Sequence, residues 1–275
     1  MKKILVVFDG GHFCESSLDF ARKLNEISPV LLVGTFLPQV DYANLWSYAE
    51  IGKHGGKVIP LLESAEAESV QVNIKRFKSF CHTNQIACTI HTEYFDFALP
   101  ELRKEARYAD IVLVSSEKFF EESGVAEPND YLKEVMHDLE CPILLIPNKY
   151  DFPKTNVLAY DGSESSVFAI RQFSYLFPEL AKHPTRVVFA DEDPLAQMPG
   201  HQAVKELVEA HFPQAEWVKL DVSPKKFFST WLLEQDKAIL VTGAYGRWAM
   251  SRFFKKSFIN DVISDHRVPI FIAHH

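Results

Sequence analysis

The same pattern of residues occurs twice in this chain, and this duplication limits the possible folds more than any other feature of the sequence. Residues 3–11, KILVVFDGG, match residues 155–163, TNVLAYDGS, because both are short apolar runs that end in Asp-Gly. Residues 110–142 align with residues 237–269 without a gap. Two matches in the same order indicate one structural unit that is present twice.

The duplication predicts two homologous domains, residues 1–149 and 150–275, and a length of 275 residues suits two domains of ordinary size. A short polar link around residues 148–155, NKYDFPKT, is expected to join them. An insert at residues 36–62 has no counterpart in the second domain. Its aromatic and apolar residues favour either a covering flap or an interface.

Within each copy, short apolar segments of β type alternate with segments of helical spacing. The predicted strands are residues 3–8, 30–36, 88–94, 111–115 and 143–147, and then 155–160, 185–190, 216–221, 238–242 and 269–273. Strands that are apolar almost throughout are typical of a parallel sheet with helices on both faces. The sequence therefore predicts an α/β fold of two tandem, doubly wound, five-stranded parallel sheets of the Rossmann-like kind.

Composition and charge exclude several classes of protein. A formal net charge of −8 disfavours nucleic-acid binding, which normally needs a basic face. The four cysteines show no CxxC spacing and the eleven histidines no HExxH motif, so we expect no metal site and a reducing compartment. The apolar run near the N-terminus ends at Asp9, too early for a signal peptide or a membrane span. We expect a soluble cytoplasmic protein that binds neither nucleic acid nor membranes.

The candidate ligand site lies at the carboxyl ends of the predicted strands, where open parallel sheets bind their ligands. Asp161 follows the first strand of the second copy, and residues 243–257, GAYGRWAMSRFFKKS, follow its fourth strand. Glycines at positions 243 and 246 allow the backbone to approach a phosphate, and the N–H groups at the start of a following helix bind anions. Four basic residues add positive charge to this stretch.

Simpler interpretations of the same residues stay open. Two glycines three positions apart are typical of a tight turn, and a basic cluster more often forms a solvated face. Neither a P-loop motif nor GxGxxG occurs, which disfavours P-loop hydrolases and nicotinamide-dependent enzymes. The sequence shows no general base, metal cluster or nucleophile–base pair, so we assign no catalytic residue and expect a protein that is not an efficient enzyme.

The Asp-Gly-Ser turn and the stretch 243–257 together resemble the universal stress protein family, whose nucleotide-binding members carry G-x2-G-x9-G-[S/T]. The resemblance covers nearly the whole chain as a tandem pair, and it implies a fold like that of the adenine nucleotide alpha hydrolases. It implies that Asp161 contacts the adenosine part of ATP. Gly243 and Gly246 would then hold phosphate, and Ser257 would complete the phosphate site. The expected nucleotide site comprises Asp161, Gly162, Ala190, Gly243, Gly246, Lys256 and Ser257.

Two departures from the family pattern affect this expected site. Lys256 occupies the position of the third glycine in the pattern. Its side chain therefore either contacts the phosphates through its positive charge or obstructs their binding. In the first copy, Ser116 and Phe119 replace the first two glycines, and an acidic stretch follows them. Carboxylates repel phosphate, so we expect no ATP in the first domain.

The resemblance implies a stress-response protein that binds ATP in its second domain without efficient catalysis, while the first domain serves structure or regulation. Two other hypotheses stay open: an interaction module that binds no nucleotide, and a slow ATPase. In single-domain relatives the last strands commonly form a dimer contact. We therefore expect either an internal pseudo-dimer of the two halves, through residues 143–147 and 270–274, or a homodimer.

Overall fold

Alternating apolar strands and amphipathic helices build both halves of the chain. The computed structural model describes residues 1–9, 12–37, 64–91, 98–117, 130–191, 193, 195–220, 224–243, 262–263 and 267–273. The first half contains β1 (Lys2–Asp9), α1 (Glu15–Ile27), β2 (Val30–Leu37), α3 (Ser64–Thr83), β3 (Ala87–His91), α4 (Ala98–Ala106), β4 (Ile111–Ser115), α5 (Asp130–Asp138) and β5 (Ile143–Ile146). The second half contains β6 (Thr155–Ala159), α6 (Glu164–Leu176), the 3-10 helix η4 (Leu180–Lys182), β7 (Thr185–Ala190), α7 (His201–His211), β8 (Ala215–Leu220), α8 (Pro224–Leu233), β9 (Ala238–Gly243) and β10 (Ile270–Ala273). The alternation predicted from the sequence is confirmed.

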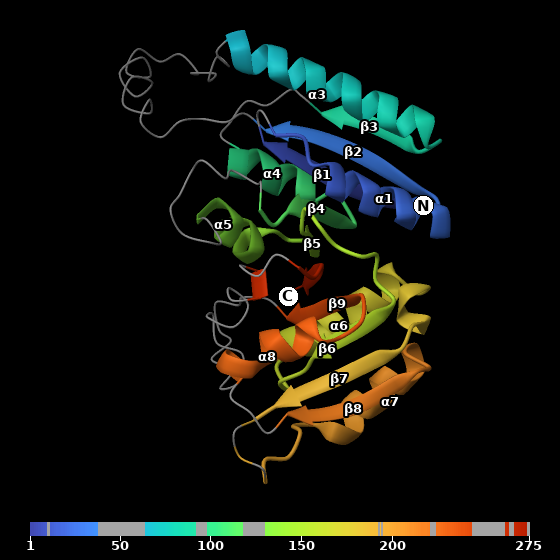
Figure 1. Ribbon diagram of the computed structural model, residues 1–275, viewed down its shortest axis with the longest axis vertical. Helices are drawn as coiled ribbons and strands as arrows, with labels where there is room; N and C mark the ends of the chain where they lie inside the picture. Colours follow the sequence, from blue (N-terminus) through green and yellow to red (C-terminus); the bar gives the residue numbers. More distant parts are fainter. Residues whose placement is uncertain are drawn as a thin grey trace.

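The described strands form one sheet of ten, in the order β3-β2-β1-β4-β5-β10-β9-β6-β7-β8, which runs from the top to the bottom of Figure 1. Neighbouring strands within each half are parallel. In each half the first strand lies in the interior and later strands are added on both of its sides. This is the doubly wound order expected from the alternation of strands and helices.

The two halves meet at β5 and β10, which run antiparallel to each other. Leu144 lies opposite Phe271, and Ile143 lies opposite Ile272. The sequence predicts two five-stranded sheets in tandem, and the structure continues one into the other. All residues of both strands are apolar and buried, so pairing them satisfies the backbone groups that each strand would otherwise expose at a sheet edge.

Each face of the sheet packs against its own layer of helices. Residues of α1, α3, α6 and α7 share one apolar cluster with the sheet, and residues of α4, α5 and α8 share the other. In the first cluster, the ring centroid of Phe173 of α6 lies 5.3 Å from that of Phe271 and 6.4 Å from that of Phe212. Burying one such side chain stabilises the fold by about 1.5–3 kcal/mol.

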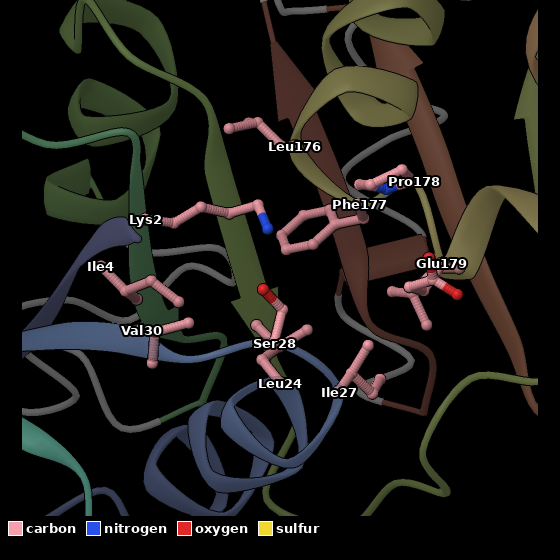
Figure 2. A pocket seen from close by; sticks show the side chains of 11 residues that line it. Lys2, Ile4, Leu24, Ile27, Ser28, Val30, Leu176, Phe177, Pro178 and Glu179 are labelled. Atoms are coloured by element: carbon pink, nitrogen blue, oxygen red, sulfur yellow. The ribbon is translucent and has the colours of Figure 1, made fainter.

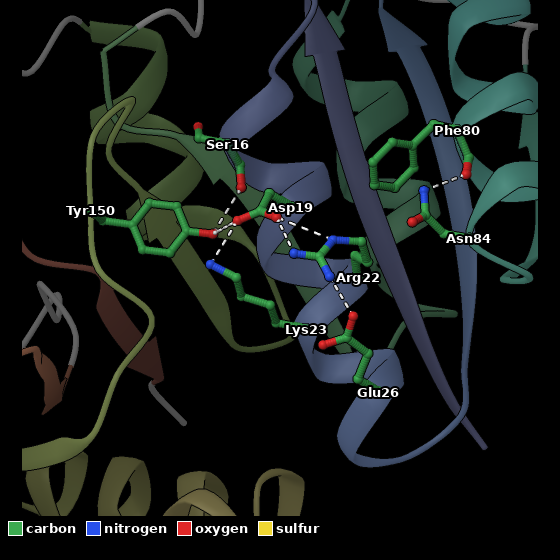
Figure 3. A network of polar contacts seen from close by, with 8 residues as sticks. All are labelled: Ser16, Asp19, Arg22, Lys23, Glu26, Phe80, Asn84 and Tyr150. Atoms are coloured by element: carbon green, nitrogen blue, oxygen red, sulfur yellow. Dashed lines mark hydrogen bonds and ion pairs between the residues drawn. The ribbon is translucent and has the colours of Figure 1, made fainter.

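The link between the halves packs against α1. Tyr150 and Phe152 both contact Phe20, with ring centroids 5.5 and 5.0 Å apart. The Tyr150 hydroxyl donates a hydrogen bond to Asp19 Oδ2 at 3.1 Å (Figure 3). Lys23 Nζ lies 5.4 Å from the centre of the Tyr150 ring. Two aromatic residues thus anchor the link that the sequence indicates only as polar.

Asp19 makes this anchoring contact sensitive to acid. Burial by itself would raise the pKa of Asp19, but hydrogen bonds from Lys23 at 2.9 Å and Arg22 at 2.6 Å outweigh burial and hold the pKa below its ordinary value of 3.8. A carboxyl whose pKa is lower in the folded state stabilises that state above its unfolded pKa. The stabilisation is lost as the pH falls through the folded pKa.

We expect Asp19→Asn to make the protein less sensitive to acid. The free energy of unfolding in urea should fall more between about pH 7 and about pH 3 for the wild type than for the variant. The Asp19 side chain is 40% exposed, so the difference should stay below about 1 kcal/mol. The control is Asp236→Asn at an exposed position, which should respond to pH like the wild type. Equal losses in the wild type and in Asp19→Asn would contradict the assignment.

Candidate functional site

The winding of the second half reverses at β6. Its neighbours are β7, which the chain reaches directly through α6, and β9, which it reaches only after β8 and α8. Such a reversal opens a crevice at the carboxyl ends of the strands. Asp161 follows β6, while Ala190 and Gly243 are the last residues of β7 and β9. The structure therefore brings these three residues to one edge of the sheet, here called the second rim.

Asp161 belongs to a tight turn between β6 and α6. Its Oδ1 accepts a hydrogen bond from the Ser163 backbone N–H at 2.9 Å, a bond typical of aspartate in turns. Ser163 in turn caps α6, because its Oγ accepts from the Ser166 N–H at 3.2 Å. The Asp161 side chain is half-buried, and its Oδ2 has no hydrogen-bond partner among the described residues. That oxygen is available to accept a hydrogen bond from a ligand.

Gly162 is required by the turn itself. Its φ of +80° is a conformation that side chains disfavour, and an added Cβ would lie 2.6 Å from the Cβ of Pro199. The Tyr160 hydroxyl donates to the Pro199 carbonyl at 2.6 Å and holds the segment before α7 against the turn. These contacts explain the glycine at position 162 without a ligand.

Gly243 allows the end of β9 to touch the first turn of α6. A Cβ at this position would lie 2.5 Å from both Ser165 C and Ser166 N, which are backbone atoms that cannot move alone. The glycine therefore has a packing role that the sequence pattern does not reveal. The same contact places the start of the capped helix α6 beside the end of β9, at the point where a loop that binds phosphate would begin.

The remaining residues of the expected site are placed as follows. Ala190 is fully buried, so its side chain belongs to the core beneath the second rim. Gly246, Lys256 and Ser257 lie outside the described residues, as does most of the insert at residues 36–62.

The equivalent edge of the first half, here called the first rim, is built differently. Asp9, the counterpart of Asp161, is only 2% exposed, and His12 Nδ1 lies 3.2 Å from each of its carboxylate oxygens. The His12 backbone N–H also donates to the Asp9 carbonyl at 2.8 Å. Ser116, which aligns with Gly243, is buried and carries a side chain where the second half requires none. The two rims therefore differ at both equivalent positions.

Sequence reasoning missed the pairing of Asp9 with His12 and the anchoring of Pro199 by Tyr160. The first has a local signal in the sequence, because aspartate and histidine three positions apart can contact each other. The second has none, because the Tyr160 hydroxyl reaches across 39 positions of the chain.

Solved structures show which fold these elements form. A universal stress protein from Archaeoglobus fulgidus DSM 4304 matches with a TM-score of 0.71, and the match covers 100% of this chain and 96% of that chain at 13% sequence identity. This chain has the universal stress protein fold. A functionally unknown protein from Pseudomonas aeruginosa PAO1 matches with a TM-score of 0.52 at 12% identity, over 100% of this chain and 92% of its own. No family model matches the sequence, and neither does any curated protein.

Two further observations describe this example of the universal stress protein fold. Among the helices that the structure describes, none is long and apolar enough to cross a membrane. In the same part of the chain, no group of three or more His, Cys, Asp or Glu side chains could hold a metal ion. The four cysteines are free thiols.

Proposed function

We propose that this protein is a cytoplasmic, tandem universal stress protein that binds an adenine nucleotide, ATP, at its second rim and does not turn it over efficiently. The observation that supports this is the difference between two equivalent aspartates. Within the described part of the chain, Asp161 has one carboxylate oxygen without a hydrogen-bond partner, whereas the carboxylate of Asp9 is buried and paired with His12. The first half then serves structure or regulation.

The described residues of the second rim fit the adenosine end of such a nucleotide. The open oxygen of Asp161 can accept a hydrogen bond from a ribose hydroxyl or from the adenine amino group. The capped start of α6 lies next to it and carries backbone N–H groups at the positive end of the helix dipole. The phosphates are assigned, from the sequence, to Gly246, Lys256 and Ser257 beyond the end of β9.

Asp161→Asn is the sharpest test, because the variant keeps an oxygen for the Ser163 N–H and replaces only the open oxygen by a donor. One hydrogen bond to a charged group is worth roughly 1.5–3 kcal/mol, so ATP affinity in calorimetry should fall by about tenfold or more. The matched control is Asp193→Asn, whose Oδ1 accepts from the Leu195 N–H in a similar turn and which should bind like the wild type. An unchanged affinity in Asp161→Asn would contradict the proposed contact.

The same titrations locate the phosphates and count the sites. We expect about one ATP per chain, loss of ATP binding in Gly246→Phe, and no change of ATP affinity in Phe119→Gly of the first half.

The role of Lys256 is tested separately. If Lys256 contacts the phosphates, Lys256→Ala should lower the affinity for ATP more than the affinity for AMP; if it obstructs them, Lys256→Gly should raise the affinity for ATP. A wild type and a Lys256→Gly variant that both bind no nucleotide would favour the interaction module instead.

A further inference from the structure

A cavity of about 210 Å³ lies between the two halves, at the opposite end of β1 from the first rim (Figure 2). Its walls come from the starts of β1 and β2 and the end of α1 on one side, and from the end of α6 and from η4 on the other. The buried part of its lining is apolar and consists of Ile4, Leu24, Val30, Phe177 and Leu180. The cavity is therefore formed by both halves together and would not exist in either half alone.

Two polar side chains point into this apolar space. Figure 2 shows the Lys2 ammonium and the Ser28 hydroxyl directed toward the centre of the cavity, near the ring of Phe177. Among the described residues, neither side chain has a hydrogen-bond or ion-pair partner. The carboxylate of Glu179 on the cavity wall is already engaged, since both of its oxygens lie 2.7 Å from Lys182 Nζ.

We infer that this cavity binds a small apolar carboxylic acid in its ionised form. Its carboxylate would accept hydrogen bonds from Lys2 Nζ and Ser28 Oγ, and its hydrocarbon part would cover Leu24, Phe177 and Leu180. A lysine ammonium has three donors and no acceptor, so a ligand that covers Lys2 must bring an acceptor, and an anion compensates the charge best. A neutral apolar ligand would leave the ammonium desolvated and unpaired.

The size of the cavity limits the acid. An engineered apolar cavity of about 150 Å³ binds benzene, so a cavity of about 210 Å³ suits the chain of an acid of roughly six to nine carbon atoms. Because the walls belong to both halves, the bound acid would connect them, and it should raise the temperature of unfolding as any ligand of the native state does.

The test compares octanoate, octanol and octylamine, which share a chain and differ in the head group. Titrations followed by NMR and by thermal unfolding should show saturable binding of octanoate, with octanol weaker by about tenfold or more. Lys2→Gln should reduce octanoate affinity by a similar factor and leave octanol unchanged. The control Lys205→Gln, on an exposed face of α7, should behave like the wild type.

A second variant tests the location. Ile27 lines the cavity and is 42% exposed, so Ile27→Trp should fill the space without disturbing the core and should abolish octanoate binding. Binding that is unsaturable, or unaltered by both variants, would overturn the inference. A preference for octylamine would overturn it too, because it would mean that the C-termini of α1 and α6, whose last turns carry no basic residue, dominate the cavity.

Discussion

Phe271→Ala is expected to lower the free energy of unfolding by about 3–5 kcal/mol, the usual cost of truncating a fully buried phenylalanine. Phe271 is 0% exposed, and its ring centroid lies 5.3 Å from that of Phe173 and 6.1 Å from that of Phe177. Its backbone is paired with Leu144 of the other half. The variant would therefore leave a cavity between α6 and the sheet at the place where the two halves join.

Urea unfolding followed by circular dichroism measures this loss. The control Leu195→Ala removes a side chain that is 86% exposed and should change the free energy of unfolding by less than about 0.5 kcal/mol. A loss below about 1 kcal/mol in Phe271→Ala would show that the joint between β5 and β10 contributes little to stability.

Gly243→Ala is expected to destabilise the protein by about 1–3 kcal/mol, although it adds a single methyl group. The new Cβ would lie 2.5 Å from Ser165 C and Ser166 N, so the end of β9 and the first turn of α6 must separate. Because α6 follows the turn that holds Asp161, the separation should also weaken ATP binding at the second rim.

Urea unfolding and ATP calorimetry on one preparation distinguish the loss of stability from the loss of ATP affinity. Ala203→Ser, on the exposed side of α7, serves as the surface control and should match the wild type in both measurements. If Gly243→Ala kept its stability and lost only ATP, the glycine would act on the ligand directly rather than through α6. Unchanged stability together with unchanged affinity would refute the close approach.

Much of the fold was predictable because its strands are apolar runs of the right length. The runs at residues 111–115 and 143–147 predicted β4 and β5 closely, since a strand covered on both faces needs apolar side chains throughout. The contacts of the link between the halves were harder to predict from the sequence. Tyr150 and Asp19 are 131 positions apart, and nothing near either residue indicates the other.

The candidate site was also predictable only in part, because a local pattern does not show which distant group a residue contacts. Asp161 and Gly162 carry a local turn signal, and the structure shows the turn. Gly243 was predicted from a spacing that concerns phosphate, whereas its visible contact is with the backbone of α6. A glycine pattern cannot distinguish the close approach of a helix from that of a ligand, because both require only the absence of a side chain. The roles of Gly246, Lys256 and Ser257 stay predictions.

The pairing of β5 with β10 also places the two fully apolar strands in the interior of the sheet. A sheet can grow only at its outer strands, and among the strands that the structure describes these are β3 and β8. Neither resembles the fully apolar strands in the middle: most residues of β3 are exposed, and β8 presents the charges of Glu216 and Lys219 to solvent. Charged side chains on an outer strand discourage the addition of another strand. In the described sheet, the most apolar strands are thus paired in the interior, and the two outer strands are poor templates for aggregation.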